Sequence, residues 1–364
     1  MSATAPPSVD ELRAEATAFL DGHAERRSTE RPFVWGEGDD DVTIVEDQPP
    51  EEEQAALAAA QAWARTRWDA GFGWLDGPVD LGGRGLTRGH VQAYRSLEAG
   101  YVLPSQSIFT IGLGMVAPTL AVHGSDAIRR QYLPGLHRGN VIACQLFSEP
   151  GAGSDLAAVA CRAERDGDKW VLTGQKVWTS NAHLAHVGEA ICRSDPTQPK
   201  HKGMTAFVVP MDAPGVTVRP LRQMSGGAGF NEVFLDGVRV RDDHRLGDIG
   251  EGWGVALTTL LNERASLGGG GMGLGRGPGP FERLVALLRH VDGTGDPVLR
   301  DRLAALYATH KTLEWTARRG RDTAGDGRPG PEMSVLKLAG TRHLSAISAF
   351  VSAALGPALL ADTG

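Results

Sequence analysis

The sequence predicts a multidomain α+β protein with an N-terminal helical domain, a middle β-barrel or sandwich domain and a C-terminal helical bundle. Apolar residues at helical spacing, with capping residues before them, fill residues 1–140. Runs that alternate between apolar and polar residues follow over residues 141–247, and helical spacing returns over residues 248–364. These changes of period predict the three domains and their bounds.

Composition narrows the class of protein. The 364 residues are 41% hydrophobic and 22% charged, as in globular domains, and the net charge of −7 argues against a nucleic-acid partner. The chain has no uninterrupted apolar run long enough for a membrane span, and the N-terminus has no signal-peptide pattern. Three cysteines without a C-x-x-C pair argue against a disulfide framework and a structural zinc, and predict a reducing, cytoplasmic setting. Cys144 and Cys192 lie in apolar, strand-like runs and are predicted to be buried.

Capping residues mark the predicted helices of the N-terminal part. Ser8 with Glu11 forms a capping-box pattern, and Thr87 and Ser125 precede further helical runs. The charged stretch 25–50, with its Pro and Gly residues, predicts an exposed loop. We therefore expect helices over residues 8–20, 51–68, 87–101, 105–123 and 125–132, and an all-helical domain.

Short runs of period two mark the predicted strands of the middle part. Asp166-Gly167 and Asp236-Gly237 are typical of hairpin turns between such runs. The runs cover residues 141–147, 158–164, 169–172, 176–180, 187–192, 205–209, 216–221, 232–234 and 238–240. Helical spacing then predicts helices from residue 252 and over residues 281–291, 297–321 and 332–360.

The stretch Cys144–Leu156 carries the first sign of chemistry. An apolar run breaks at Pro150, and the loop behind it contains Gly151, Gly153 and Ser154. Glycines let a ligand approach the main chain closely, and exposed N–H groups can bind polar ligand atoms. Taken alone, this loop is more typical of a β-turn between two strands.

Four sequence blocks, in this order along the chain, resemble the acyl-CoA dehydrogenase family. The chain resembles an actinobacterial-type member of that family. Gln145–Asp155 resembles the family's flavin signature, and Gly174–Asn181 resembles its second flavin-contacting strand. Phe230–Val240 resembles its characteristic late strand, and Gly252-Trp253 with Leu261–Arg264 resembles the start of its C-terminal helical domain. The resemblance weakens after Gly268.

The resemblance implies an FAD-dependent oxidoreductase of fatty acid and lipid metabolism. The implied reaction is the α,β-dehydrogenation of an acyl-CoA thioester to the 2-enoyl-CoA. A carboxylate removes the α proton, and the β hydrogen leaves as hydride to FAD because side chains cannot accept it. The implied partners are an electron-transfer flavoprotein and further subunits, in a homo- or hetero-oligomer that is a dimer or tetramer.

The resemblance also implies a set of cofactor-binding residues. Trp178 would stack against the flavin, Thr179 and Ser180 would bond its polar atoms, and Ser154 would also meet the pantetheine arm of the substrate. On their own, Trp178 is more typical of core packing and Ser148 of an ordinary strand residue. The implied set is Gln145, Phe147, Ser148, Gly153, Ser154, Trp178, Thr179 and Ser180.

Glu263 is the predicted catalytic base. It lies in Leu261-Asn-Glu-Arg264, where some branches of the family carry their carboxylate, and Asn262 and Arg264 are the implied substrate-binding neighbours. A helix-surface carboxylate paired with a nearby arginine is an equally supported interpretation.

The chain departs from the family pattern in its C-terminal part. Relatives usually carry Arg-x-x-Phe-Gly where this chain has Gly275–Arg283, and neither Arg276 nor Arg283 has the spacing. Relatives also continue beyond the position of Gly364. Two alternatives therefore stay open: a non-catalytic or half-site scaffold subunit of a heteromeric dehydrogenase, and an oxygen-using flavin oxidase or monooxygenase.

Overall fold

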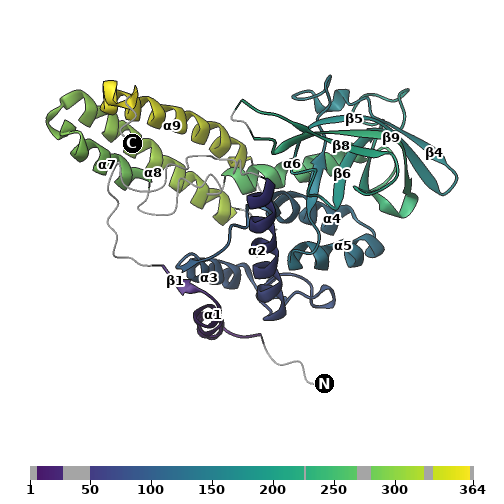
Figure 1. The fold of residues 1–364 in the computed structure, drawn as a ribbon, viewed down its shortest axis with the longest axis horizontal. Coiled ribbons are helices and arrows are strands. Elements are labelled where there is room, and N and C mark those ends of the chain that lie inside the picture. The colour runs from purple at the N-terminus through teal and green to yellow at the C-terminus, as the bar shows by residue number, and fades with distance from the viewer. Residues whose placement is uncertain (1–5, 28–49, 225–226, 269–279, 324–330, 361–364) are drawn as a thin grey trace. The chain divides into compact units, whose positions relative to one another are not determined.

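The computed structural model describes residues 6–27, 50–224, 227–268, 280–323 and 331–360. The chain forms two compact units, of which the first comprises residues 1–27 and 43–260 and the second residues 28–42 and 261–364. Figure 1 labels the helices and strands of both units. The predicted bounds of three domains at residues 140 and 247 stay a prediction.

Among the described residues, five α-helices precede the sheet in the first unit. Ser8 caps the first of them: its hydroxyl accepts from the Glu11 N–H at 3.2 Å, and its own N–H donates to the Glu11 carboxylate at 2.6 Å, so the predicted capping box is confirmed. A π-helical turn at Gly112–Val116 replaces part of the continuous helix expected over residues 105–123. The helices are α1 Val9–His23, α2 Pro50–Asp69, α3 Arg88–Glu98, α4 Ala117–His123 and α5 Asp126–Arg138.

The prediction that the N-terminal part is all-helical is wrong, because two short strands pair within it. Strand β1, Glu25–Arg26, pairs antiparallel with β2, Tyr101–Val102. The carboxylate of Asp21 explains this pairing, because it accepts from the Tyr101 hydroxyl at 2.8 Å and from Arg26 at 2.7 Å. One acidic side chain at the end of α1 thus holds both short strands together.

The middle part is one eight-stranded sheet that does not close. Its path runs β10-β7-β6-β4-β5-β9-β8, and β3 pairs parallel with β6. The prediction of a barrel is therefore wrong, although the α+β class with a β middle part is confirmed. The sheet ends at β8 because Pro220 in that strand lacks an N–H and suits an edge. The strands are β3 Ala143–Leu146, β4 Arg162–Asp166, β5 Lys169–Ser180, β6 Val187–Arg193, β7 Met204–Pro210, β8 Val216–Leu221, β9 Phe230–Arg241 and β10 Arg245–Leu246.

Only one of the two predicted hairpin turns is present. Asp166-Gly167 joins β4 to β5, which confirms the first. Asp236-Gly237 lies inside the continuous strand β9, opposite a register shift in β5, so the second prediction is wrong. Gly237 takes a φ of 63° there, and the Asp236 N–H donates to Gly215 O at 2.9 Å. The dipeptide therefore forms a bulge rather than a turn.

Both faces of strands β6 and β7 are buried. On one face, Cys192 of β6 and Phe207 of β7 lie in a core that also holds Cys144. On the other face, Ile191 and Val208 pack in a core shared with helices α4, α5 and the first half of α6, Gly252–Gly268. The three cysteines are free and buried, which confirms the predicted burial of Cys144 and Cys192.

The second unit is a helical bundle. Helix α8, Pro297–Thr323, and helix α9, Glu332–Leu355, lie side by side (Figure 1). With α7, Pro280–His290, they enclose a core that includes Leu287 and Phe350. The predicted departure at Arg276 lies outside the described residues.

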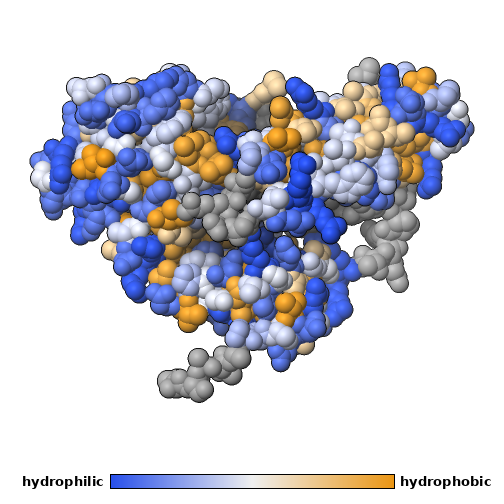
Figure 2. Space-filling view, turned by 180° about the vertical axis from the view of Figure 1, so that it is seen from behind, coloured by the Kyte–Doolittle hydropathy of each residue, from blue (hydrophilic) through white to orange (hydrophobic). Residues whose placement is uncertain are grey.

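Within the described ranges, every helix is too short or too polar to cross a bilayer. On the face in Figure 2, hydrophobic residues stand in separate patches among hydrophilic ones.

Candidate functional site

The end of β3 and the end of β5 bring the two predicted flavin stretches together. The Val177 N–H of β5 donates to the carbonyl oxygen of Ser148 at 2.9 Å. Trp178 follows directly, so Ser148 and Trp178 lie on neighbouring segments of the sheet. A loop, strand β4 and most of β5 separate these residues in the sequence, and only the pairing makes them neighbours.

Trp178 occupies a bulge in β5. The register against β9 shifts between Lys176 and Thr179, and Trp178 takes a φ of 61°, in the left-handed region that bulky residues avoid. Its side chain is 62% exposed and meets the ring of Phe230 edge-on, with 6.2 Å between centroids. Strain of this kind gathers at functional sites, and here it holds a large aromatic ring out toward solvent.

Thr179 follows the bulge and is buried, but its hydroxyl lacks a hydrogen-bond partner among the described residues. Its carbonyl oxygen accepts from Asn231 at 3.1 Å. A buried polar group without a partner costs about 1–3 kcal/mol. A ligand that reaches this hydroxyl would remove that cost.

The loop after Glu149 is held at its base and open at its tip. Glu149 and Ala152 exchange two backbone hydrogen bonds, of 2.8 and 3.0 Å. Gly151, Gly153 and Ser154 are exposed, and a Cβ placed on either glycine would meet nothing within 4 Å. The glycines are thus not needed by packing inside this unit, which leaves room for a ligand against the backbone.

Gln145 of β3 and Phe147, which follows the last residue of that strand, lie on the helix-facing side of the sheet. Phe147 is buried in the core shared with the helices, whereas Gln145 is half-buried. The register places Gln145 beside Glu189 of β6. The Phe147 side chain therefore packs in the core beneath the sheet.

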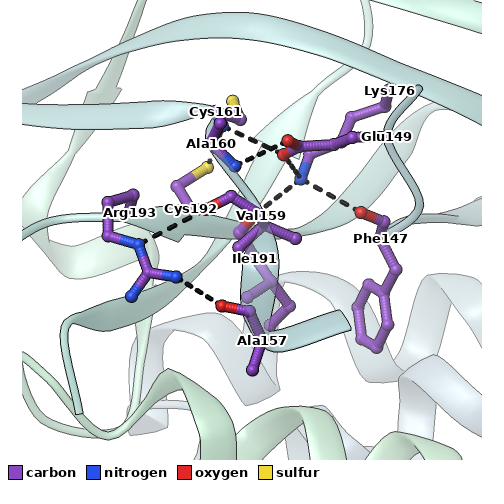
Figure 3. A network of polar contacts seen from close by, with 10 residues as sticks. All are labelled: Phe147, Glu149, Ala157, Val159, Ala160, Cys161, Lys176, Ile191, Cys192 and Arg193. Atoms are coloured by element: carbon purple, nitrogen blue, oxygen red, sulfur yellow. Dashed lines mark hydrogen bonds and ion pairs between the residues drawn. The ribbon is translucent and has the colours of Figure 1, made fainter. Parts of the chain in front are cut away.

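A buried ion pair lies beneath the loop, and sequence reasoning missed it. Lys176 Nζ donates to Glu149 Oε1 at 2.7 Å, and both side chains are buried (Figure 3). The one signal in the sequence is a lysine at a position of β5 where the strand pattern expects burial.

A second buried carboxylate, Glu189, was also missed. Its Oε1 accepts from the Thr259 hydroxyl at 2.6 Å, and that hydroxyl lies 2.8 Å from the hydroxyl of Thr119. Burial raises the pKa of Glu189 to about 8, against the lowering effect of the Thr259 hydroxyl. Glu189 is therefore held mainly in its neutral form at neutral pH.

The predicted base lies in the second unit. The Glu263 carboxylate accepts from Lys337 Nζ at 2.8 Å, so it has an ion-pair partner, though not the arginine of the alternative interpretation. Asn262 and Arg264 are half-buried on the same helix. That these three residues face the cofactor residues of the first unit stays a prediction.

Domain comparisons cover most of the chain. Models of the acyl-CoA dehydrogenase N-terminal, middle and C-terminal domains match residues 44–140, 144–238 and 250–364.

Two mycobacterial proteins and one solved structure are similar to the chain. Acyl-CoA dehydrogenase FadE34 of Mycobacterium tuberculosis is 43% identical over 236 residues, which are 65% of this chain and 32% of that protein. Acyl-CoA dehydrogenase IpdE1 of the same organism is 39% identical over 266 residues, 72% of this chain and 66% of that protein. The Tcur3481-Tcur3483 steroid ACAD superposes with a TM-score of 0.70 at 26% identity, covering 98% of this chain and 87% of that one.

The matches thus span about a third of FadE34 and about two thirds of IpdE1. Three domain matches in the family's order and the mycobacterial relatives agree with the four sequence blocks. The chain therefore belongs to the acyl-CoA dehydrogenase family of FAD-dependent oxidoreductases and is an actinobacterial-type member.

Proposed function

We propose that the chain is an acyl-CoA dehydrogenase that converts an acyl-CoA thioester to the 2-enoyl-CoA. The observation that carries this proposal is Trp178, which a strained bulge holds in solvent beside Ser148. FAD supplies the hydride acceptor that protein side chains lack.

The residues of the first unit fit a flavin. Trp178 offers an aromatic face for stacking, and Thr179 offers a buried hydroxyl without a partner among the described residues. The open space at Gly151 and Gly153 lets a planar or phosphate-bearing ligand approach the main chain. Gln145, Ser148, Ser154 and Ser180 complete the polar edge that we assign to FAD and to the pantetheine arm.

Glu263 is the proposed general base. A carboxylate that takes the α proton must break its ion pair during turnover. Because Lys337 is half-exposed, breaking its pair with Glu263 costs little free energy. Asn262 and Arg264 flank it on the same helix and are the proposed contacts of the acyl-CoA.

The proposed electron acceptor is an electron-transfer flavoprotein, and the proposed assembly is an oligomer in the cytoplasm. Exposed apolar side chains on α8 and α9, among them Trp315 and Leu338, support contacts with another subunit. The similar steroid ACAD is named for two components, Tcur3481 and Tcur3483, which supports a search for a second subunit. Free, buried cysteines support a reducing compartment.

Bleaching of bound flavin by acyl-CoA tests this function. Glu263→Gln should keep FAD bound and abolish bleaching, since the amide cannot accept the α proton. Glu314→Gln is the matched control, because Glu314 is another Lys-paired carboxylate of the same unit, 2.7 Å from Lys311. Unchanged turnover in Glu263→Gln would remove Glu263 from the mechanism.

Two other outcomes would replace the proposal. A protein that gains flavin only with a second subunit would be a half-site or scaffold subunit. Oxygen consumption without reduction of an electron-transfer flavoprotein would indicate a flavin oxidase or monooxygenase.

A further inference from the structure

Lys176 uses all three protons of its ammonium group inside the protein. Its Nζ donates to Glu149 Oε1 at 2.7 Å, to Ile191 O at 2.7 Å and to Phe147 O at 3.2 Å (Figure 3). An ammonium has three donors, so none remains for a ligand. The side chain is completely buried and joins β5 to the end of β3 and to β6.

Glu149 extends this network across the loop. Its Oε2 accepts from the Ala160 N–H at 2.6 Å and its Oε1 from the Cys161 N–H at 3.0 Å. Glu149 stands before the Gly151–Asp155 loop, and Ala160 and Cys161 stand behind it. One carboxylate therefore ties the two ends of the loop to Lys176.

Stability alone gives no reason to keep a buried charge pair here. Moving both charges out of water is costly, and well-packed apolar residues of similar volume are often equally stable or more stable. What apolar residues could not do is satisfy the carbonyls of Phe147 and Ile191 and the N–H groups of Ala160 and Cys161. The pair thus holds these backbone segments in place, and the same segments form the proposed flavin site.

The backbone held by the pair carries Ser148 and Trp178. Ser148 lies between Phe147 and Glu149, both of which Lys176 contacts, and Trp178 lies two residues beyond Lys176. We propose that Lys176 and Glu149 are positioning residues that set Ser148 and Trp178 in the geometry required to bind flavin. This inference rests on the proposed function.

The test replaces both charges together, so that neither is left buried alone. Lys176→Met with Glu149→Leu should keep the apo protein folded, because no charge is left buried alone, but should lower its melting temperature, because the backbone groups that the pair satisfies lose their partners. FAD affinity should fall by roughly tenfold or more, as when outer-shell partners of a site are removed. The visible spectrum of bound flavin should shift, and amide exchange at Ala160 and Cys161 should accelerate. Lys200→Met is the control, because it breaks the exposed Lys200–Asp155 pair of the same loop and should leave FAD affinity unchanged.

A second variant, Glu149→Gln, keeps the side-chain volume if the double variant fails to fold. It should also weaken FAD binding and shift the flavin spectrum, to a smaller extent. If either folded variant binds FAD with wild-type affinity and spectrum, the positioning role is wrong and the pair is structural only. If the wild type itself fails to bind FAD, the proposed function fails instead, so the two failures are distinct.

Discussion

Two Lys–Glu pairs, one in each unit, have nearly the same length and different surroundings. Lys176–Glu149 spans 2.7 Å with side chains 0% and 7% exposed, whereas Lys337–Glu263 spans 2.8 Å with side chains 42% and 23% exposed. Water screens the second pair and can replace either partner, whereas nothing can replace a partner in the first. The distance between the charged atoms therefore does not distinguish these two ion pairs, whereas the burial of their side chains does.

The difference matches the roles that we assign. A general base has to change its protonation state and its partner within each turnover, which suits Glu263. A residue that positions the backbone must keep both its protonation state and its partner, and the buried Glu149 meets this requirement. Substitutions that remove one group at a time separate these roles.

Lys176→Met should give the largest loss of stability. It leaves the Glu149 charge buried without its partner, which costs about 3–5 kcal/mol in the free energy of unfolding. Urea denaturation followed by far-UV circular dichroism measures this loss. A change under about 1 kcal/mol, the value for exposed pairs, would place this pair in the same class as Lys337–Glu263.

Glu189 should make stability fall as pH rises. Burial raises its pKa from 4.5 to about 8, so the native state keeps a proton that the unfolded chain has already lost above 4.5. The stabilising effect of the bound proton is complete below pH 4.5. It is lost progressively up to about pH 8, and over this range the free energy of unfolding falls by about 1.4 kcal/mol per pH unit.

Glu189→Gln cannot titrate, and the difference between its pH–stability curve and that of the wild type measures the effect. This difference cancels other groups, such as His137, whose pKa burial and the nearby Arg67 lower to about 3. Parallel curves between pH 5 and 8 would contradict the raised pKa of Glu189.

Thr179→Val should act in opposite directions on the apo protein and on its complex. The valine removes a buried hydroxyl without a partner among the described residues, so apo stability should rise by about 1 kcal/mol while FAD affinity falls. Thr205→Val is the control, because the equally buried Thr205 hydroxyl accepts from the Gly250 N–H at 3.1 Å and its loss should destabilise. Weaker apo stability in Thr179→Val would show that the protein itself satisfies this hydroxyl.

Lys337→Met should have the smallest effect on stability, within about 1 kcal/mol, because the pair is partly solvated. Thermal unfolding of the variant beside the wild type measures it. A loss as large as that in Lys176→Met would mean that the exposed pair holds the second unit together.

The features that sequence reasoning predicted depend on residues close together in the chain. The Ser8–Glu11 capping box and the Asp166-Gly167 turn are of this kind, and both are present. Asp236-Gly237 carries the same local signal as Asp166-Gly167, yet pairing with β5 carries the strand through it as a bulge. An Asp-Gly dipeptide can form either a hairpin turn or a bulge. The pairing with the neighbouring strand determines which of the two structures forms.

The parts that sequence reasoning missed depend on long-range pairing. The acceptors of Lys176 lie 15 to 29 residues away in the chain, and the Thr259 that contacts Glu189 lies 70 residues away. The four family-like blocks predict Ser148 and Trp178 as cofactor residues, and this role stays a prediction. Which partners hold them in place could be seen only once the strands were paired.

The visible absorption spectrum tests the central claim most directly. The wild type and Trp178→Ala are incubated with FAD, passed through a desalting column and scanned. We expect the wild type to retain flavin with a perturbed spectrum, and Trp178→Ala to retain less with a spectrum closer to that of free FAD. A colourless wild type, or equal retention and equal spectra in both proteins, would contradict the claim that the β5 bulge beside Ser148 forms the flavin site.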